Sequence, residues 1–261
     1  MHRATSAALA TLSLLAVAAL TACGGTGDAD SGSDSAVGEP TTTAPSTKEP
    51  GAAERLARTM VTTSDVEGFR VAEPDEEFRF ARTPDEVTLD KPVCAPLAHA
   101  MNQLPLGEPE ADLTRVVSGQ RDTGSPGTGH RAPGTGTANG IGFTYITLTA
   151  HRSGGAKSAF TGVRKAVESC GGGFTAEANG AKTPYDSVTA EQVTPAGDES
   201  LGFKATMTTL GVPHVLHTEV VRSGDVLAVH FSVDGMAIAD RRPSDAKLSP
   251  TVVNAQNRKL G

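Results

Sequence analysis

The sequence predicts an α+β domain with one curved, mainly antiparallel sheet, helices packed on one face of that sheet, and one disulfide. Apolar and polar residues alternate through most of residues 199–234, as in strands joined by short turns. Apolar residues recur every three or four positions over residues 156–170, as on the buried side of a helix. Cys94 and Cys170 both lie within residues 53–261 and can supply the disulfide. Because the apolar face of a sheet must be covered, these observations together indicate the α+β class.

The clearest local pattern is an antiparallel meander in residues 199–234. Gly211-Val212 fits a two-residue turn with glycine at its first central position, and Ser223-Gly224 fits a second two-residue turn. Both turns place the apolar side chains of the three strands on one face, so the two registers agree. The predicted apolar pairs across the strands are Met207 with Leu216, Phe203 with Val220, and Val220 with Leu227.

The same registers gather polar side chains on the other face of the meander. Lys204 is predicted to lie opposite Glu219, and His217 opposite His230. Two histidines and a lysine could attract an acidic ligand, and that attraction would grow as pH falls through the imidazole range. A plain solvent-exposed face is the simpler interpretation and the one that we favour. Lys204, His217, Glu219 and His230 are therefore the possible ligand-facing residues.

The histidines of the meander do not predict a metal site. His217 and His230, with Glu219 nearby, could hold zinc in principle. His214 and His217 cannot act together, because residues three apart on a strand point to opposite faces. Two exposed imidazoles on a solvated sheet are the simpler interpretation, so we expect no metal and no cofactor.

Shorter periodic segments predict the remaining elements. Helices are expected around Leu56 and Met60, from Pro96 to Leu104, and after the capping residue Ser249. Strands are expected at residues 113–117, at residues 141–150, and around Phe78 and Phe80. Residues 119–140 are rich in Gly, Ser, Thr and Pro, and this composition predicts a mobile insertion between two strands.

Cys23 indicates where the protein resides. A basic start is followed by an apolar stretch of about 14 residues, which is too short to span a bilayer but suits a signal-peptide core. Leu20-Thr21-Ala22-Cys23 resembles the lipobox of bacterial lipoproteins, which implies a lipid on the Cys23 thiol and cleavage before it. An ordinary secretory signal with a chance cysteine is the alternative. We expect attachment to the extracytoplasmic face of the cell membrane through Cys23.

The chain divides into three predicted parts. Residues 1–22 form the signal peptide, residues 23–52 the lipidated cysteine and a disordered tether, and residues 53–261 a single domain. The tether has almost no large apolar side chains, so it cannot bury enough surface to offset the entropy of ordering. The remaining length suits one hydrophobic core.

The charge of the chain argues against nucleic acid as a partner. Without residues 1–22 the chain carries 22 Lys and Arg against 30 Asp and Glu, a net charge of about −8. An acidic chain gains little from releasing counterions at a phosphate backbone.

Cys94 and Cys170 are the only thiols left once Cys23 carries a lipid. In an oxidising compartment such a pair is expected to be joined. Closing a loop of about 76 residues stabilises the fold by about 4.5 kcal/mol in the chain-entropy model. A redox-active pair is the alternative, although the C-x-x-C spacing is missing.

No catalytic motif is found. The segment from Gly197 to Gly202 lacks the spacing of a nucleophile elbow. Ser244-Asp245-Ala246-Lys247 matches S-x-x-K without the S-D-N and K-T-G partners that would give it meaning. Walker, H-E-x-x-H and G-x-G-x-x-G motifs are absent from the sequence. We therefore expect a protein that is not an enzyme.

Three short motifs stand out: Ala159-Phe160-x-x-Val163-Arg164-x-Ala166-Val167-x-x-Cys170, Gly197-Asp198-Glu199-Ser200, and Val220-Val221-Arg222-x-Gly224-Asp225-Val226. They resemble actinobacterial lipoproteins related to the extracellular sensor domain of PknH-type serine/threonine kinases. The resemblance implies an extracellular, disulfide-stapled antiparallel sheet with helices that binds an unidentified ligand. It covers about residues 54–261. The kinase sensor has two disulfides and this chain can form one.

The function expected from these observations is a membrane-anchored envelope lipoprotein with a non-enzymatic, sensor-like domain that binds an unknown ligand or envelope protein. A lipid or glycolipid carrier and an uncharacterised envelope hydrolase are the alternatives. A large apolar cavity would favour the carrier, and a concave site joining Ser or Asp to a histidine would favour the hydrolase.

Overall fold

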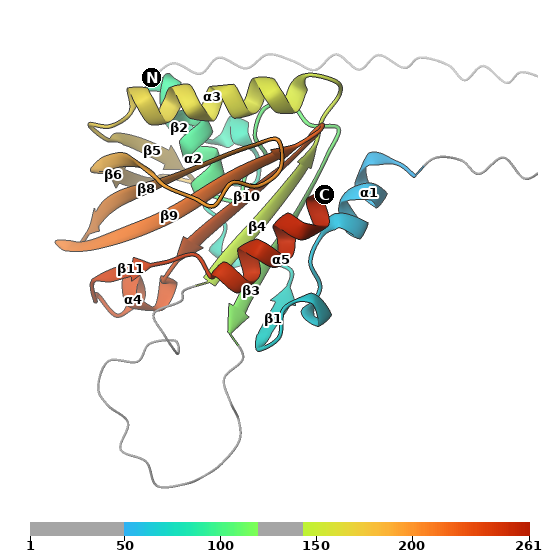
Figure 1. The fold of residues 1–261 in the computed structure, drawn as a ribbon. Coiled ribbons are helices and arrows are strands. Elements are labelled where there is room, and N and C mark those ends of the chain that lie inside the picture. Colours follow the sequence, from blue (N-terminus) through green and yellow to red (C-terminus); the bar gives the residue numbers. More distant parts are fainter. Residues whose placement is uncertain (1–49, 120–142) are drawn as a thin grey trace, which may run out of the picture. The chain divides into compact units, whose positions relative to one another are not determined.

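The main sheet has eight strands that are almost all antiparallel, as predicted (Figure 1). The computed structural model describes residues 50–119 and 143–261, all within one compact unit. The strand order is β1-β3-β4-β10-β9-β8-β7, and β11 pairs with β9 in parallel. The strands are β1 (Phe69–Ala72), β3 (Ala111–Gly119), β4 (Phe143–Ala150), β7 (Ser187–Glu191), β8 (Glu199–Thr209), β9 (Val212–Ser223), β10 (Val226–Val233) and β11 (Ser244–Ala246).

A smaller sheet and five helices complete the described residues. The smaller sheet has the order β2-β5-β6, formed by β2 (Thr88–Leu89), β5 (Phe174–Ala178) and β6 (Ala181–Tyr185). The helices are α1 (Ala52–Thr59), α2 (Ala95–Met101), α3 (Gly155–Ser169), α4 (Gly235–Ala239) and α5 (Pro250–Leu260). None of the described helices is long and apolar enough to cross a membrane.

Helices cover both faces of the main sheet. The predicted cover is confirmed for α2 and α3, which pack with the apolar face of the meander through buried residues such as Phe160, Phe203 and Leu227. The structure adds α1 and α5 on the opposite face, where Leu56 and Val252 pack with Ile146 of β4. In Figure 1, α3 runs along one side of the sheet and α5 along the other.

The predicted registers of the meander are wrong by two residues at each turn. The first turn is Leu210-Gly211, both with positive φ, and Thr209 pairs with Val212. The second turn is Gly224-Asp225, with Ser223 paired to Val226. Because side chains alternate with a period of two, a shift of two residues keeps every side chain on its predicted face and changes only its neighbour.

The corrected registers give the polar residues different partners. His217 lies opposite Lys204 on one side and Ser232 on the other. Glu219, and not His217, lies opposite His230. The predicted pairs of Lys204 with Glu219 and of His217 with His230 therefore do not form.

The predicted disulfide is present. Cys94 and Cys170 are bonded, both are fully buried, and their Cα atoms are 6.0 Å apart. The bond joins the residue before α2 to the residue after α3, so it fixes two helices that cover the same face of the main sheet.

Two further expectations concern other segments. Residues around Phe78 do not form a strand, because Glu76–Phe78 is a short 3-10 turn capped by Asp75. The insertion predicted at residues 119–140 lies, apart from Gly119 at the end of β3, outside the described residues. The signal peptide, Cys23 and the tether up to residue 49 also lie outside them.

Candidate functional site

An apolar cavity of about 720 Å³ lies on the face of the main sheet that α2 covers. Its lining comes from β3, β4, β8, β9 and β10 of the main sheet, and from the end of α2, from β6 and from α4. Tyr145 and Phe231 stack beside each other in the lining, with ring centroids 6.1 Å apart. The main apolar contributors are Phe80, Met101, Met207, Leu216, Phe231 and Val233.

The end of α2 forms one border of the cavity. The helix ends at Met101, and Gln103 adopts a left-handed backbone conformation with φ 61°, so the chain turns away before it covers the rest of the sheet. Asn102 secures this end by donating from Nδ2 to the carbonyl oxygen of Ala98 at 2.7 Å. The predicted helix continued to Leu104, which would have left less room over the sheet.

A few polar groups lie among the apolar side chains of the cavity. The Tyr185 hydroxyl accepts a hydrogen bond from Asn102 Nδ2 at 3.1 Å, and burial raises the pKa of Tyr185 to about 12. Gln103 Oε1 is buried and has no hydrogen-bond partner among the described residues. A buried acceptor without a partner costs about 1–3 kcal/mol, and this oxygen has almost no surface open to the cavity.

The rim of the cavity is acidic. Glu73 and Asp75 are exposed and line it, and Met236 of α4 also lines the cavity, with 51% of its surface exposed. None of the described residues that line the cavity is Lys, Arg or His. Burial raises the pKa of Tyr145, and the negative charge of Asp75 raises it further. The charge of Asp75 therefore acts on the interior of the cavity.

Two of the four predicted polar residues, His217 and Glu219, line a second hollow, a cleft of about 660 Å³ on the opposite face of the sheet. His217 lies at its base and is only 2% exposed. Its Nδ1 is 2.7 Å from Glu191 and its Nε2 is 2.6 Å from Asp245. Lys247 Nζ lies 3.3 Å from the same Nε2 and 3.1 Å from Asp245. His217 thus links β7, β9 and β11.

Hydrogen bonds from His217 and Lys247 affect the pKa of Asp245. Burial acts to raise the pKa of Asp245, but hydrogen bonds from His217 and Lys247 outweigh it and the pKa is lowered. Both ring nitrogens of His217 have hydrogen-bond partners within the protein, so neither is free to contact a ligand.

Glu219 and His230 are buried next to each other on neighbouring strands. Burial raises the pKa of Glu219, and the hydrogen bond from Asn257 at 3.1 Å offsets part of that rise. Burial lowers the pKa of His230 to about 4, with a small opposing effect from the main chain of Glu219. Fully enclosed, His230 does not reach the cleft, and Lys204 is exposed without lining it. Of the four predicted residues, His217 and Glu219 line the cleft.

One wall of the cleft is the loop between β7 and β8, residues 192–198. A Cβ at Gly202 would lie 2.4 Å from Val193, and a Cβ at Gly197 would lie 2.3 Å from the carbonyl oxygen of Arg222. Gly197 also has a positive φ of 57°. Glycine at these two positions lets the loop lie directly against the sheet.

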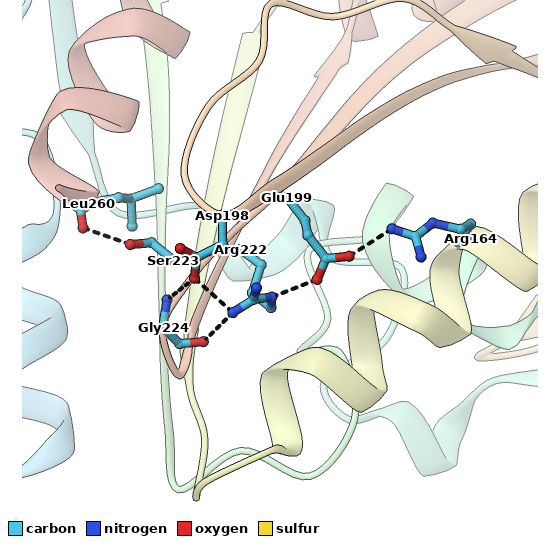
Figure 2. Close-up of polar contacts among 7 residues, drawn as sticks. All are labelled: Arg164, Asp198, Glu199, Arg222, Ser223, Gly224 and Leu260. Carbon is cyan, nitrogen blue, oxygen red and sulfur yellow. Dashed lines mark hydrogen bonds and ion pairs between the residues drawn. The ribbon is translucent and has the colours of Figure 1, made fainter.

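Arg222 fastens this loop to the sheet (Figure 2). Its guanidinium donates to Asp198 and to Glu199, each at 2.8 Å, and to the carbonyl oxygen of Gly224 at 3.0 Å. Arg164 reaches Glu199 from α3 at 2.8 Å, and Arg164 and Arg222 together lower the pKa of Glu199. These contacts hold α3, β8 and β9 together at the end of the loop.

The cleft does not assemble a recognisable catalytic group. Its described lining contains no serine or cysteine, and both nitrogens of His217 are occupied. In the part of the chain that the structure describes, no cluster of three or more His, Cys, Asp or Glu is suited to a metal ion. Ser244 does meet a histidine, His214, at 2.9 Å, but neither residue lines a described cavity.

Sequence reasoning missed the apolar cavity. Its lining comes from segments that lie far apart in the chain, from Glu73 to Ala239, and no local motif joins them. The sequence places Met207 and Phe231 on the apolar face of the meander. It does not indicate how much of that face the helices cover.

No protein-family model matches the chain, and no curated protein matches it. Among solved structures, the chain is similar to the extracellular domain of PknH from Mycobacterium tuberculosis. The two are 12% identical, the match covers 81% of this chain and 95% of that domain, and the TM-score is 0.45.

Proposed function

We propose that this protein is a lipid-anchored, extracytoplasmic binding protein, without catalytic activity, that holds a ligand with an apolar body. The single observation that carries the proposal is the 720 Å³ cavity lined by Phe80, Met207 and Phe231. Ligand sites of small molecules are typically concave, mostly apolar and between about 300 and 1,000 Å³. The apolar lining favours a lipid or glycolipid as the ligand. In its more specific form, the proposal is that the protein carries such a molecule.

The proposed anchor is the lipid on Cys23. Its support is the Leu20-Thr21-Ala22-Cys23 string together with the short apolar stretch before it. The Cys23→Ser variant is expected to leave the membrane fraction and appear in the medium or as unprocessed precursor. The measurement is fractionation with mass spectrometry of the N-terminus, and an unchanged membrane fraction would contradict the anchor.

The cavity is tested with N-phenyl-1-naphthylamine, an apolar probe whose fluorescence rises when it leaves water. We expect the purified domain to bind it at a single site. Val233→Trp fills the cavity from β10 and should weaken binding at least tenfold. The control is Val212→Trp, which places the same side chain at another partly buried strand position that does not line the cavity.

The outcomes of this test separate cleanly. Loss of binding in Val233→Trp with full binding in Val212→Trp supports the proposal, provided that both variants retain the circular dichroism spectrum of the parent. No binding by the parent domain, or equal binding by both variants, contradicts it.

A further inference from the structure

We propose that the cavity selects a ligand whose head group carries hydrogen-bond donors and no negative charge, such as a long-chain alcohol, a glyceride or an amine. The inference rests on the proposed function, because it concerns the same cavity. It excludes ionised fatty acids and phosphate esters as preferred ligands, although their tails would fit equally well.

The first argument is the charge at the rim. The ionised side chains that line the cavity are Glu73 and Asp75, and its described lining contains no cation. Two cations lie nearby, but Arg115 pairs with Glu73 at 3.4 Å and Arg79 pairs with Glu76 at 3.2 Å. Neither arginine lines the cavity. Since like charges repel most strongly where water is partly excluded, an anionic head group is disfavoured here.

Asp75 has the clearest effect on this site. Its carboxylate accepts a hydrogen bond from the main-chain nitrogen of Glu77 at 3.0 Å, which holds it at the start of the short 3-10 turn Glu76–Phe78. Among the described residues it has no ion-pair partner. Its charge raises the pKa of Tyr145 inside the cavity, so the two groups interact.

The second argument is the unpaired acceptor. Gln103 lines the cavity, and its Oε1 is buried without a hydrogen-bond partner. Its backbone is held in the left-handed region at the end of α2. This oxygen has almost no surface open to the cavity, so a ligand reaches it only after the Gln103 side chain turns. A hydroxyl or ammonium group would then satisfy it, whereas a carboxylate or a phosphate without a proton has no donor to give.

The experiment uses four ligands with the same ten-carbon tail: decanoate, 1-decanol, decylamine and decyltrimethylammonium. Each displaces N-phenyl-1-naphthylamine from the domain at pH 7.5. We expect decanol and decylamine to displace the probe at concentrations at least tenfold lower than decanoate. Decyltrimethylammonium is cationic without a donor, so it should fall between decylamine and decanoate.

Variants assign the selectivity to the two residues. Asp75→Asn removes the charge and keeps an oxygen that can accept from Glu77, and it should improve decanoate binding at least threefold. Glu77→Gln is the matched control. It also removes one negative charge, two residues from Asp75, but the Glu77 side chain does not line the cavity. Gln103→Met keeps the side-chain length, and it should weaken decanol and decylamine while leaving decyltrimethylammonium unchanged.

Failure of this inference is distinguishable from failure of the proposed function. If the probe binds but the four ligands displace it within twofold of one another, or decanoate is the best, the head-group selectivity is wrong and the apolar site stands. If the probe and all four ligands fail to bind, the proposed function itself is wrong and the inference falls with it.

Discussion

Burial changes the pKa of individual residues on the polar face of the meander, which α5 covers. Glu219 and His230 lie opposite each other on β9 and β10. Burial raises the pKa of Glu219 and lowers that of His230, so the neutral form of each residue is favoured. The expectation that His230 would attract an acidic ligand as pH falls is therefore wrong, because the residue is enclosed and resists protonation.

His230 should make the domain sensitive to acid. Its pKa is about 4 in the folded protein and about 6.5 in the unfolded chain. The folded state is thus favoured fully above pH 6.5, and this stabilisation is lost as pH falls from 6.5 toward 4. The loss amounts to about 3 kcal/mol. Urea unfolding from pH 7 to pH 4.5 should show a smaller decrease for His230→Leu than for the parent.

Three other histidines set the background for that measurement. Burial also lowers the pKa of His99, of His151 and of His214, so the variant retains part of the acid sensitivity. Parallel stability curves for the parent and His230→Leu would falsify the assigned role of His230.

The sequence indicates the face of each candidate residue but not its environment. Alternation along β8, β9 and β10 places Lys204, His217, Glu219 and His230 on one face, as the structure confirms. Whether that face meets water depends on α5, which packs on it from the other end of the chain. A local pattern does not contain that information, so His217 and Glu219 were expected on a plain surface.

At the scale of elements, the turns show why the register was missed by two residues. Glycine at residue 211 fits either the first position of one turn type or the second position of another. The structure uses the second, which requires Leu210 to adopt a positive φ of 52°. A non-glycine residue in that region is uncommon, so the sequence favours the other turn.

The same scale explains the cavity. The pattern from Pro96 to Leu104 correctly predicts a helix, but α2 stops at Met101 and leaves part of the sheet uncovered. A cavity is a region that side chains do not fill, and periodicity reports only the residues that are present. Its position follows from where α2, β6 and α4 end relative to one another, which the fold alone determines.

At the scale of the whole molecule, the disulfide should contribute strongly to stability. It closes a loop of 76 residues, which corresponds to about 4.5 kcal/mol in the chain-entropy model. The free energy of unfolding of the double variant Cys94→Ala with Cys170→Ala should therefore be lower by roughly this amount, as measured by urea unfolding. A reductant should destabilise the parent and leave the variant unchanged, and an equal response of both proteins would contradict the assignment.

Gln256 of α5 has a consequence for how the chain folds. It is fully buried, accepts a hydrogen bond from the main chain of Val61 at 3.0 Å, and donates to the carbonyl oxygen of Thr59 at 2.9 Å. These contacts join residues 195 and 197 positions apart. Contacts of such long range form late, because the entropy of closing the loop is lost before they add stability. The contact between α1 and α5 therefore forms only when the last residues of the chain are in place, whereas the packing of α1 on β3 and β4 does not depend on α5.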